Sequence, residues 1–382
     1  MKKTNNIIQS DSGERVETIK EKLRAVLADH KVKTADIQAV SGPSVTTYKV
    51  YPAKGVSCTK VKRLQDEIEF FLDAGGVRVV TLSDAVGIEV ANERPSIVPL
   101  KPLLDSDEFK NSDAALPVAI GRDAQGNPKI IDLAQAPHIL MAGASMQGKT
   151  EAVHSLILSL LYSHIPEEVK FVFIDPKECE LKAYETLNEE YIAVLPDVEK
   201  KAIATTAEEA EKILHSLCLE IEYRYCTLAR DKVNNIREYN VKAEEGRKMP
   251  YIVVVIDEYG DYMGFIGRDR KSREVRSDIL NHIVNLAQKG RAVGIHLVIT
   301  TQRPSPAIIT GAIKANFPTR LAFRTAARQE SFAIIDVPGA ERLIGGGDML
   351  LEFGGEITRV QGAYAGQEEI YDIVGILKSE KR

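Results

Sequence analysis

Residues 143–150, GASMQGKT, constrain the fold of this chain more than any other segment, because they match the pattern GxxxxGK[ST]. The apolar run ILMA at 139–142 precedes the pattern, and the apolar segment 152–165 follows it. Between a strand and a helix, such a loop directs backbone N–H groups and the positive helix terminus at phosphate. The predicted nucleotide-binding residues are Gly143, Ala144, Ser145, Met146, Gln147, Gly148, Lys149 and Thr150.

Two side chains of this loop have expected chemical roles. Lys149 is expected to reach the β- and γ-phosphates of a nucleoside triphosphate, and the Thr150 hydroxyl is expected to ligate Mg²⁺. The segment therefore predicts ATP and Mg²⁺ as cofactors and an ATPase as the class of enzyme.

Further polar residues follow apolar runs in the same half of the chain. YIVVVI at 251–256 ends in two acids, of which Asp257 is predicted to complete the Mg²⁺ shell and Glu258 to polarise the attacking water. Either acid also fits the N-cap of a following helix. Gln302 follows another apolar run and is predicted to sense the γ-phosphate, with an ordinary loop glutamine as the alternative. Asp175 and Lys177 fit a structural turn better than a catalytic role.

The apolar runs themselves indicate the fold class. They lack polar alternation, which is typical of strands buried on both faces of a mainly parallel sheet covered by helices. We therefore predict an α/β P-loop ATPase domain over residues 138–382. The runs that define it are ILMA (139–142), FVFI (171–174), YIVVVI (251–256), HLVIT (296–300) and RLAF (320–323).

The N-terminal part predicts a separate, small α+β domain over residues 13–103, after a disordered segment at 1–12. Residues 104–137, rich in Pro and Asp, are predicted to connect the two domains. The expected elements of the small domain are helices over 14–30 and 59–73 and strands over 45–53, 77–82 and 86–92.

Composition and charge limit the kinds of partner and the cellular location that we predict for the protein. The net charge of −5 argues against a surface that coats nucleic acid throughout, although it permits a localised basic stripe. No signal peptide and no run of about 18 apolar residues is found, so we predict a cytoplasmic chain without a membrane segment. The four cysteines form no CxxC pair and are predicted to be free, buried thiols.

Several segments, taken in order, resemble the motor of the FtsK/SpoIIIE family of double-stranded DNA translocases. The upstream piece SGPSVTTYKVYPAKGV resembles the small α-domain of that family, so the resemblance covers roughly residues 14–370. The motor segments are PHILMAGASMQGKT, FVFIDPKECEL, YIVVVIDEYGDYM, LAQKGRAVGIHLVITTQRPS, ITGAIKANFPTRLAF and GAERLIGGGDMLL.

This resemblance implies a RecA-like ATPase that assembles as a hexameric ring around duplex DNA. It implies that ATP lies at subunit interfaces and that a neighbouring subunit supplies an arginine. Arg291 and Arg320 occupy arginines of the family pattern, and Arg320 is the predicted arginine finger. Lys149 and Thr150 correspond to the Walker A pair, Asp257 and Glu258 to the Walker B pair, and Gln302 to the sensor.

The chain also departs from the family pattern. Met146 and Gln147 replace a glycine and a serine of the usual loop. Neither a membrane anchor nor the γ-domain is expected in this chain, which indicates a motor-only fragment or a stand-alone relative. Two other functions stay open, a secretion-type FtsK-like ATPase that moves protein and a scaffold that binds nucleotide without hydrolysis. The candidate DNA contacts, each of which also fits a solvated loop, are Arg268, Arg270, Lys271, Arg273 and Lys314.

Overall fold

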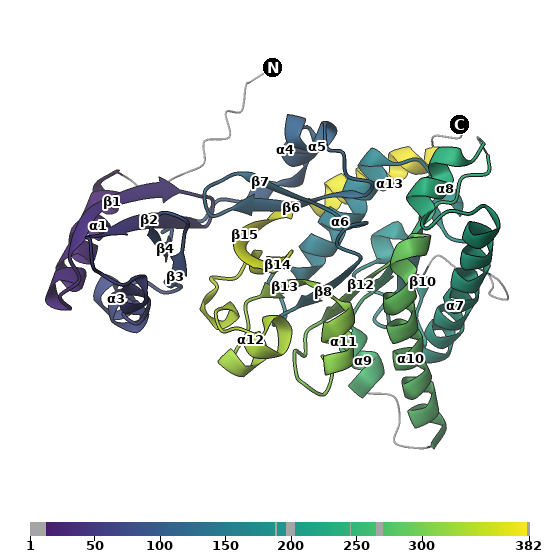
Figure 1. Cartoon of the computed structure of the whole chain (residues 1–382). Helices are drawn as coiled ribbons and strands as arrows, with labels where there is room; N and C mark the ends of the chain where they lie inside the picture. Colours follow the sequence, from purple (N-terminus) through teal and green to yellow (C-terminus); the bar gives the residue numbers. More distant parts are fainter. Residues whose placement is uncertain (1–12, 188, 196–202, 245, 265–269, 380–382) are drawn as a thin grey trace.

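The computed structural model describes residues 13–187, 189–195, 203–244, 246–264 and 270–379 of the chain (Figure 1). The disorder predicted for residues 1–12 and the candidate DNA contact Arg268 lie outside these described residues.

The small domain is an antiparallel sheet packed against helices, as predicted. Its strands lie in the order β1-β2-β4-β3, and apolar side chains from α1 and α3 fill the space against one face of the sheet. Its elements are α1 (Gly13–Asp29), β1 (Thr34–Ser41), β2 (Val45–Pro52), α2 (Cys58–Lys62), α3 (Gln65–Leu72), β3 (Arg78–Thr81) and β4 (Val86–Ala91). The single helix predicted over 59–73 is wrong, because the backbone leaves helical geometry at Leu64.

The large sheet is mostly parallel, as predicted for the α/β domain, but it continues into an antiparallel part. Its order is β10-β9-β11-β12-β8-β13-β14-β15-β6-β7, and β5 also pairs with β15. All pairs from β10 to β13 are parallel, and all pairs from β13 to β7 are antiparallel. Its strands are β5 (Val98–Pro99), β6 (Pro117–Asp123), β7 (Pro128–Asp132), β8 (His138–Ala142), β9 (Val169–Ile174), β10 (Ile203–Ala204), β11 (Tyr251–Ile256), β12 (Ile295–Thr301), β13 (Thr319–Phe323), β14 (Asp348–Phe353) and β15 (Glu356–Tyr364).

The segment 104–137, predicted as a connector, instead contributes the hairpin β6–β7 to the large sheet. Several of the Pro and Asp residues that suggested a connector stand at the ends of these strands, since β6 runs from Pro117 to Asp123 and β7 from Pro128 to Asp132. In the hairpin turn, the Asp123 carboxylate accepts hydrogen bonds from the amides of Gln125 and Asn127, both at 2.9 Å. Turn residues therefore obscured two short strands.

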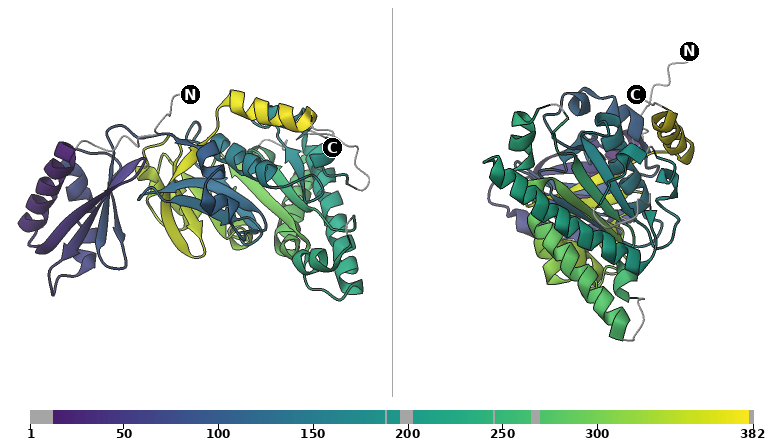
Figure 2. Two further views of the ribbon diagram at one scale, coloured as in Figure 1. Left: turned by 90° about the horizontal axis from the view of Figure 1, so that it is seen from above. Right: turned by 90° about the vertical axis from the view of Figure 1, so that its right-hand side faces the viewer.

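Helices cover both faces of the large sheet (Figures 1 and 2). Alternate residues of β11 show this arrangement, since Val253 and Val255 pack into one apolar core and Val254 and Ile256 into the other. The first core contains side chains of α4 (Leu100–Leu104), α5 (Asp107–Lys110), α6 (Lys149–Ser163) and α13 (Gln367–Ser379). The second contains those of α7 (Ala207–Arg230), α8 (Ile236–Lys242), α9 (Tyr259–Gly264), α10 (Arg270–Val293), α11 (Gly311–Asn316) and α12 (Arg328–Ile335).

Two arginines of the large domain bind the small domain. The Arg359 side chain, 1% exposed, donates to Asp348 at 2.7 Å and reaches Gly76 O at 3.2 Å and Glu89 at 3.4 Å. Arg342 pairs with Asp66 and Glu69 of α3. The antiparallel part of the large sheet therefore lies between the small domain and the parallel strands (Figure 2).

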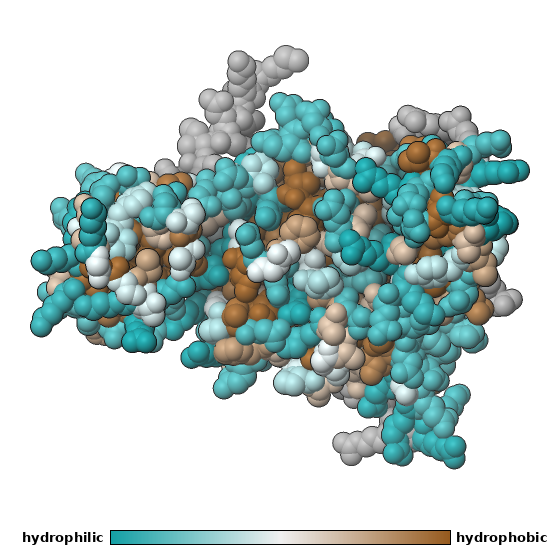
Figure 3. Space-filling model, in the orientation of Figure 1, coloured by the Kyte–Doolittle hydropathy of each residue, from teal (hydrophilic) through white to brown (hydrophobic). Residues whose placement is uncertain are grey.

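On the face shown in Figure 3, hydrophilic residues dominate and apolar residues form separate patches. No helix of the described residues combines the length and apolar character needed to cross a bilayer. All four cysteines are free, as predicted, but only Cys218 is buried.

A pair of buried histidines stands at the amino ends of β8 and β12. His138 Nδ1 accepts the Leu297 amide at 3.0 Å, and His296 Nδ1 donates to Pro137 O at 2.9 Å. Burial lowers the pKa of His138 to about 3 and that of His296 to about 4. Both imidazoles are therefore neutral in the folded chain at neutral pH.

Acid is expected to destabilise the fold through this pair. Each histidine takes up a proton below about pH 6.5 only when unfolded, so stability falls as the pH drops from about 6.5 toward 4. At about pH 5, each contributes about 2 kcal/mol to that loss. His138→Asn keeps an acceptor for the Leu297 amide but does not titrate. Between neutral pH and pH 5, its free energy of unfolding, measured by urea denaturation, should therefore fall less than that of the wild type. The exposed His30→Asn variant is the control, and an equal loss in His138→Asn would contradict the account.

Candidate active site

Polar side chains converge where the parallel strands end, at what we call the carboxyl edge of the large sheet. β8 pairs in parallel with β12 on one side and β13 on the other, and β12 pairs with β11. Three segments consequently meet at one edge: residues 143–150 after β8, the acids after β11 and Gln302 after β12. The structure brings these predicted residues together.

Close packing requires glycine at both ends of the loop 143–150. A Cβ at Gly143 would lie 2.7 Å from Cβ of Phe323, and a Cβ at Gly148 would lie 2.6 Å from Cα of Gly347. Both glycines also have positive φ angles, 155° and 106°. Since β13 and the glycine loop 345–347 press on the turn, the spacing of glycines in the motif follows from backbone contacts.

The residues between these glycines bind neighbouring loops. Ala144 N donates to Arg324 O at 2.9 Å, and Gln147 O accepts from Gly347 N at 3.0 Å. The Ser145 hydroxyl donates to the side chain of Gln302. Met146, 96% exposed, adopts a left-handed φ of 59° that would suit the glycine it replaces.

Lys149 begins α6 and folds back over the loop. Its ammonium, on a side chain that is largely buried, donates to Gly143 O at 2.9 Å and Ala144 O at 2.8 Å. Burial lowers the pKa of Lys149 to about 8, although the charges of Glu258 and Asp257 oppose this effect. Phosphate oxygens entering the loop would provide stronger, charged acceptors for this ammonium.

Asp257 occupies a half-buried position next to other carboxylates. The Thr300 hydroxyl donates to it at 2.6 Å and accepts the Glu258 amide at 3.1 Å. Burial raises the pKa of Asp257 to about 6, the Thr300 hydrogen bond lowers it, and the charges of Asp175, Glu180 and Glu258 raise it further. A cation would relieve this crowding of negative charge. Together with the Thr150 hydroxyl at the start of α6, Asp257 supplies the oxygen donors that suit Mg²⁺.

Glu258 is 2% exposed and has a left-handed φ of 45°, which is costly for a residue with a side chain. Its carboxylate accepts hydrogen bonds from Gln302 N at 3.1 Å and from the Thr301 hydroxyl at 3.3 Å. The side chain therefore turns to the end of β12 rather than to the amides of α9, which excludes the N-cap alternative in this structure.

Asp175 builds a turn, which confirms the structural interpretation of this residue. Its buried carboxylate accepts five amides at 3.0–3.1 Å, those of Lys177, Glu178, Cys179, Glu180 and Leu181. The turn directs Lys177 to Asp261 at 3.2 Å and to Glu258 at 3.7 Å.

Arg320 does not have the free side chain that an arginine finger requires. It is 9% exposed and bonds within its own chain to Phe317 O at 3.1 Å, Asp336 at 2.8 Å and Glu352 at 3.1 Å. The structure thus argues against the role predicted for it, since releasing the guanidinium would break its ion pairs with both Asp336 and Glu352.

The structure describes the surroundings of three further predicted cations. Arg291 is exposed in the last turn of α10, at the amino edge of the sheet. Lys314 pairs with Asp336 at 2.5 Å. Arg270 pairs with Glu274 at 2.8 Å.

Sequence reasoning missed residues that frame the site. Thr300 orients Asp257, and the exposed Arg324 follows β13 directly beside loop 143–150. Loop 345–347 packs against Gly148. The position of Arg324 just after RLAF and the run GGG before Asp348 were the available signals.

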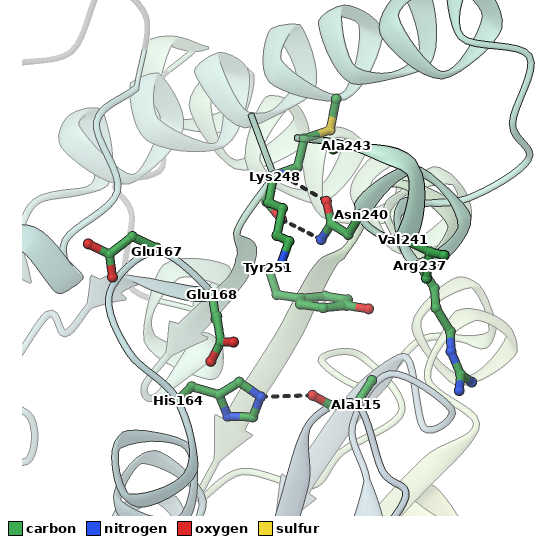
Figure 4. A pocket seen from close by; sticks show the side chains of 11 residues that line it. Ala115, His164, Glu167, Glu168, Arg237, Asn240, Val241, Ala243, Lys248 and Tyr251 are labelled. Atoms are coloured by element: carbon green, nitrogen blue, oxygen red, sulfur yellow. Dashed lines mark hydrogen bonds between the residues drawn. The ribbon is translucent and has the colours of Figure 1, made fainter. Parts of the chain in front are cut away.

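A cavity of about 600 Å³ lies at the opposite, amino edge of the sheet (Figure 4). Acidic Glu167 and Glu168 and basic Arg237 and Lys248 line it, and His164 bonds to Ala115 O at 2.9 Å. This cavity is separate from the convergence of predicted residues at the carboxyl edge.

Comparison with models of known protein families shows to which family the chain belongs. The profile described as "FtsK/SpoIIIE family" matches residues 99–306, and the profile "FtsK alpha domain" matches residues 1–92. The chain belongs to the FtsK/SpoIIIE family. The match confirms the family predicted from the sequence motifs.

Known proteins agree with this assignment. "DNA translocase FtsK" of Clostridium tetani is 40% identical over 368 residues, which cover 94% of this chain and 47% of that protein. The chain thus spans about half the length of the curated relatives it matches.

Two solved structures share the fold. The pCW3 conjugation coupling protein TcpA, in its monomer form with ATPgS, has a TM-score of 0.65 at 23% identity, covering 94% of this chain and 99% of that one. The cytoplasmic domain of the Type VII Secretion ATPase EccC of Thermomonospora curvata has a TM-score of 0.61 at 24% identity, covering 75% and 35%. These similarities confirm the predicted fold class.

Gly148→Ala is expected to abolish nucleotide binding at loop 143–150. The added Cβ would press on the backbone of Gly347, so the loop must shift out of its phosphate-binding shape. Calorimetric titration with ATP measures the effect. Gly126→Ala is a matched control, because Gly126 also has a positive φ, 88°, but open space around it. Retention of wild-type affinity by Gly148→Ala would contradict this interpretation of the loop.

Proposed function

We propose that this chain hydrolyses ATP and uses the energy to move double-stranded DNA through a ring of identical subunits. The observation that carries the proposal is the convergence of Lys149, Asp257, Glu258 and Gln302 at the carboxyl edge. Family membership and the translocase names of the relatives support DNA as the substrate.

Each residue has a defined task in the proposed hydrolysis. Loop 143–150 holds the phosphates through its amides, and Lys149 moves from the loop carbonyls to the β- and γ-phosphate oxygens. Glu258 polarises the attacking water. Gln302, already in contact with Ser145, responds to the γ-phosphate. Bound Mg²⁺, held by Thr150 and Asp257, would neutralise phosphate charge.

The proposed ring, hexameric by analogy with the family, places a neighbour's arginine at each nucleotide. Such an arginine must be exposed on its own subunit before assembly. Arg291 meets this condition and Arg320 does not. We therefore retain Arg291 as the candidate from the family pattern.

The DNA contacts proposed for the ring channel are electrostatic. Within the described residues, Arg270 and Lys271 open α10 with exposed side chains, whereas Lys314 is held by Asp336. Contacts of this kind bind the phosphate backbone without regard to sequence.

A second candidate function is movement of protein, as in a secretion ATPase. The fold similarity to EccC favours it, although that similarity shows the fold alone. Duplex DNA binding with an affinity that falls steeply with salt would support DNA as the substrate, because counterion release accompanies phosphate contacts. Binding that is absent, or insensitive to salt, would favour protein.

Lys149→Ala is expected to abolish ATP hydrolysis, because the transferring phosphoryl group loses its ammonium partner. In the wild type, duplex DNA should increase the steady-state rate of ATP hydrolysis. Exposed Lys182→Ala serves as the matched control and should retain that rate. If DNA leaves the rate of the assembled ring unchanged, the translocase proposal fails. If the wild type turns over no ATP, a nucleotide-binding scaffold replaces it.

A further inference from the structure

Hydrogen-bond donors and a cation surround the Glu258 carboxylate in this structure. One oxygen accepts from Gln302 N at 3.1 Å and from the Thr301 hydroxyl at 3.3 Å. The other accepts from Gln302 N at 3.2 Å and lies 3.7 Å from the Lys177 ammonium. With its side chain 2% exposed, this carboxylate has little room for a catalytic water. At least one of these groups must move away before Glu258 polarises water.

Among these groups, Lys177, which forms an ion pair with Glu258, is best placed to leave. Thr301 ends the central strand β12, where it pairs with Ala142 of β8, and Gln302 follows it directly. The Lys177 side chain, in contrast, is 43% exposed and ends a flexible four-carbon stem. Asp261, in the first turn of α9, lies closer to the same ammonium, at 3.2 Å.

The backbone around Lys177 is fixed independently of any nucleotide. The buried Asp175 carboxylate binds the amides of residues 177–181 and so anchors the turn. Lys177 can therefore exchange partners by side-chain rotation alone, while its Cα stays in place. Two carboxylates, from Glu258 and Asp261, share one ammonium in this arrangement.

We propose that Lys177 is a positioning residue that holds Glu258 in a resting position, and that Asp261 keeps the ammonium alone when Glu258 turns to the attacking water. This proposal rests on the proposed function, because it assumes that Glu258 acts in ATP hydrolysis. Lys177 touches neither the nucleotide nor the water in this scheme. Lys177 sets the fraction of time in which Glu258 is free to polarise the attacking water.

The two partners of Lys177 should have opposite effects on the rate. Removing the ammonium frees Glu258, so Lys177→Met should raise the kcat of ATP hydrolysis without DNA. Removing the charge of Asp261 leaves the ammonium to Glu258 alone, so Asp261→Asn should lower kcat. Once Lys177 is absent, Asp261→Asn should have no further effect.

Steady-state ATPase kinetics of the full chain without DNA test this scheme. Lys177→Met should raise kcat about threefold and leave the KM for ATP within about twofold, given the strength of a partly exposed ion pair. Lys177→Arg, which keeps the charge, should stay near the wild type. Lys182→Met, an exposed lysine of the same segment, is the control for a general effect of losing charge.

The outcomes separate this inference from the proposed function. If wild type and Lys149→Ala hydrolyse ATP equally, the proposed function itself fails. If the wild type is active but Lys177→Met has an unchanged or lower kcat, only the positioning role of Lys177 is overturned. Should Lys177→Met fail to fold, Asp261→Asn decides, since an unchanged or higher kcat in that variant also overturns the role.

Discussion

The close approach of loop 143–150 to the backbones of Phe323 and Gly347 is the constraint on which the site depends. Contacts of 2.6–2.7 Å from a hypothetical Cβ leave no space for side chains at Gly143 and Gly148. The loop is therefore clamped between β13 and the glycine loop 345–347. Because β8 lies inside the parallel part of the sheet, this clamp also sets where residues from β11 and β12 meet the loop.

Buried carboxylates then fix the loops around that clamp. Asp175 binds the turn that carries Lys177, and Asp348 follows the glycine loop and pairs with Arg359. Arg359 in turn reaches Glu89, so one chain of contacts runs from loop 143–150 to the small domain. Asp175 thus binds backbone amides of its own turn, and Asp348 binds the buried guanidinium of Arg359.

The parallel strands and the convergence at the carboxyl edge could be predicted from the sequence, because continuous apolar runs and the residues that follow them carry that information. The hairpin β6–β7 could not, since its turn residues suggested a connector. Arg320 shows a different limit of prediction from the sequence. Its partners Asp336 and Glu352 lie 16 and 32 residues away, so only the folded chain shows that its charge is already paired.

The most direct test of the central claim is electron microscopy of the chain with duplex DNA, Mg²⁺ and a slowly hydrolysed ATP analogue. The account predicts a triphosphate within loop 143–150, with Asp257 and Glu258 facing it, in a closed ring around the duplex. A nucleotide bound elsewhere, or a loop that stays closed over Lys149 in DNA-bound particles, would contradict it.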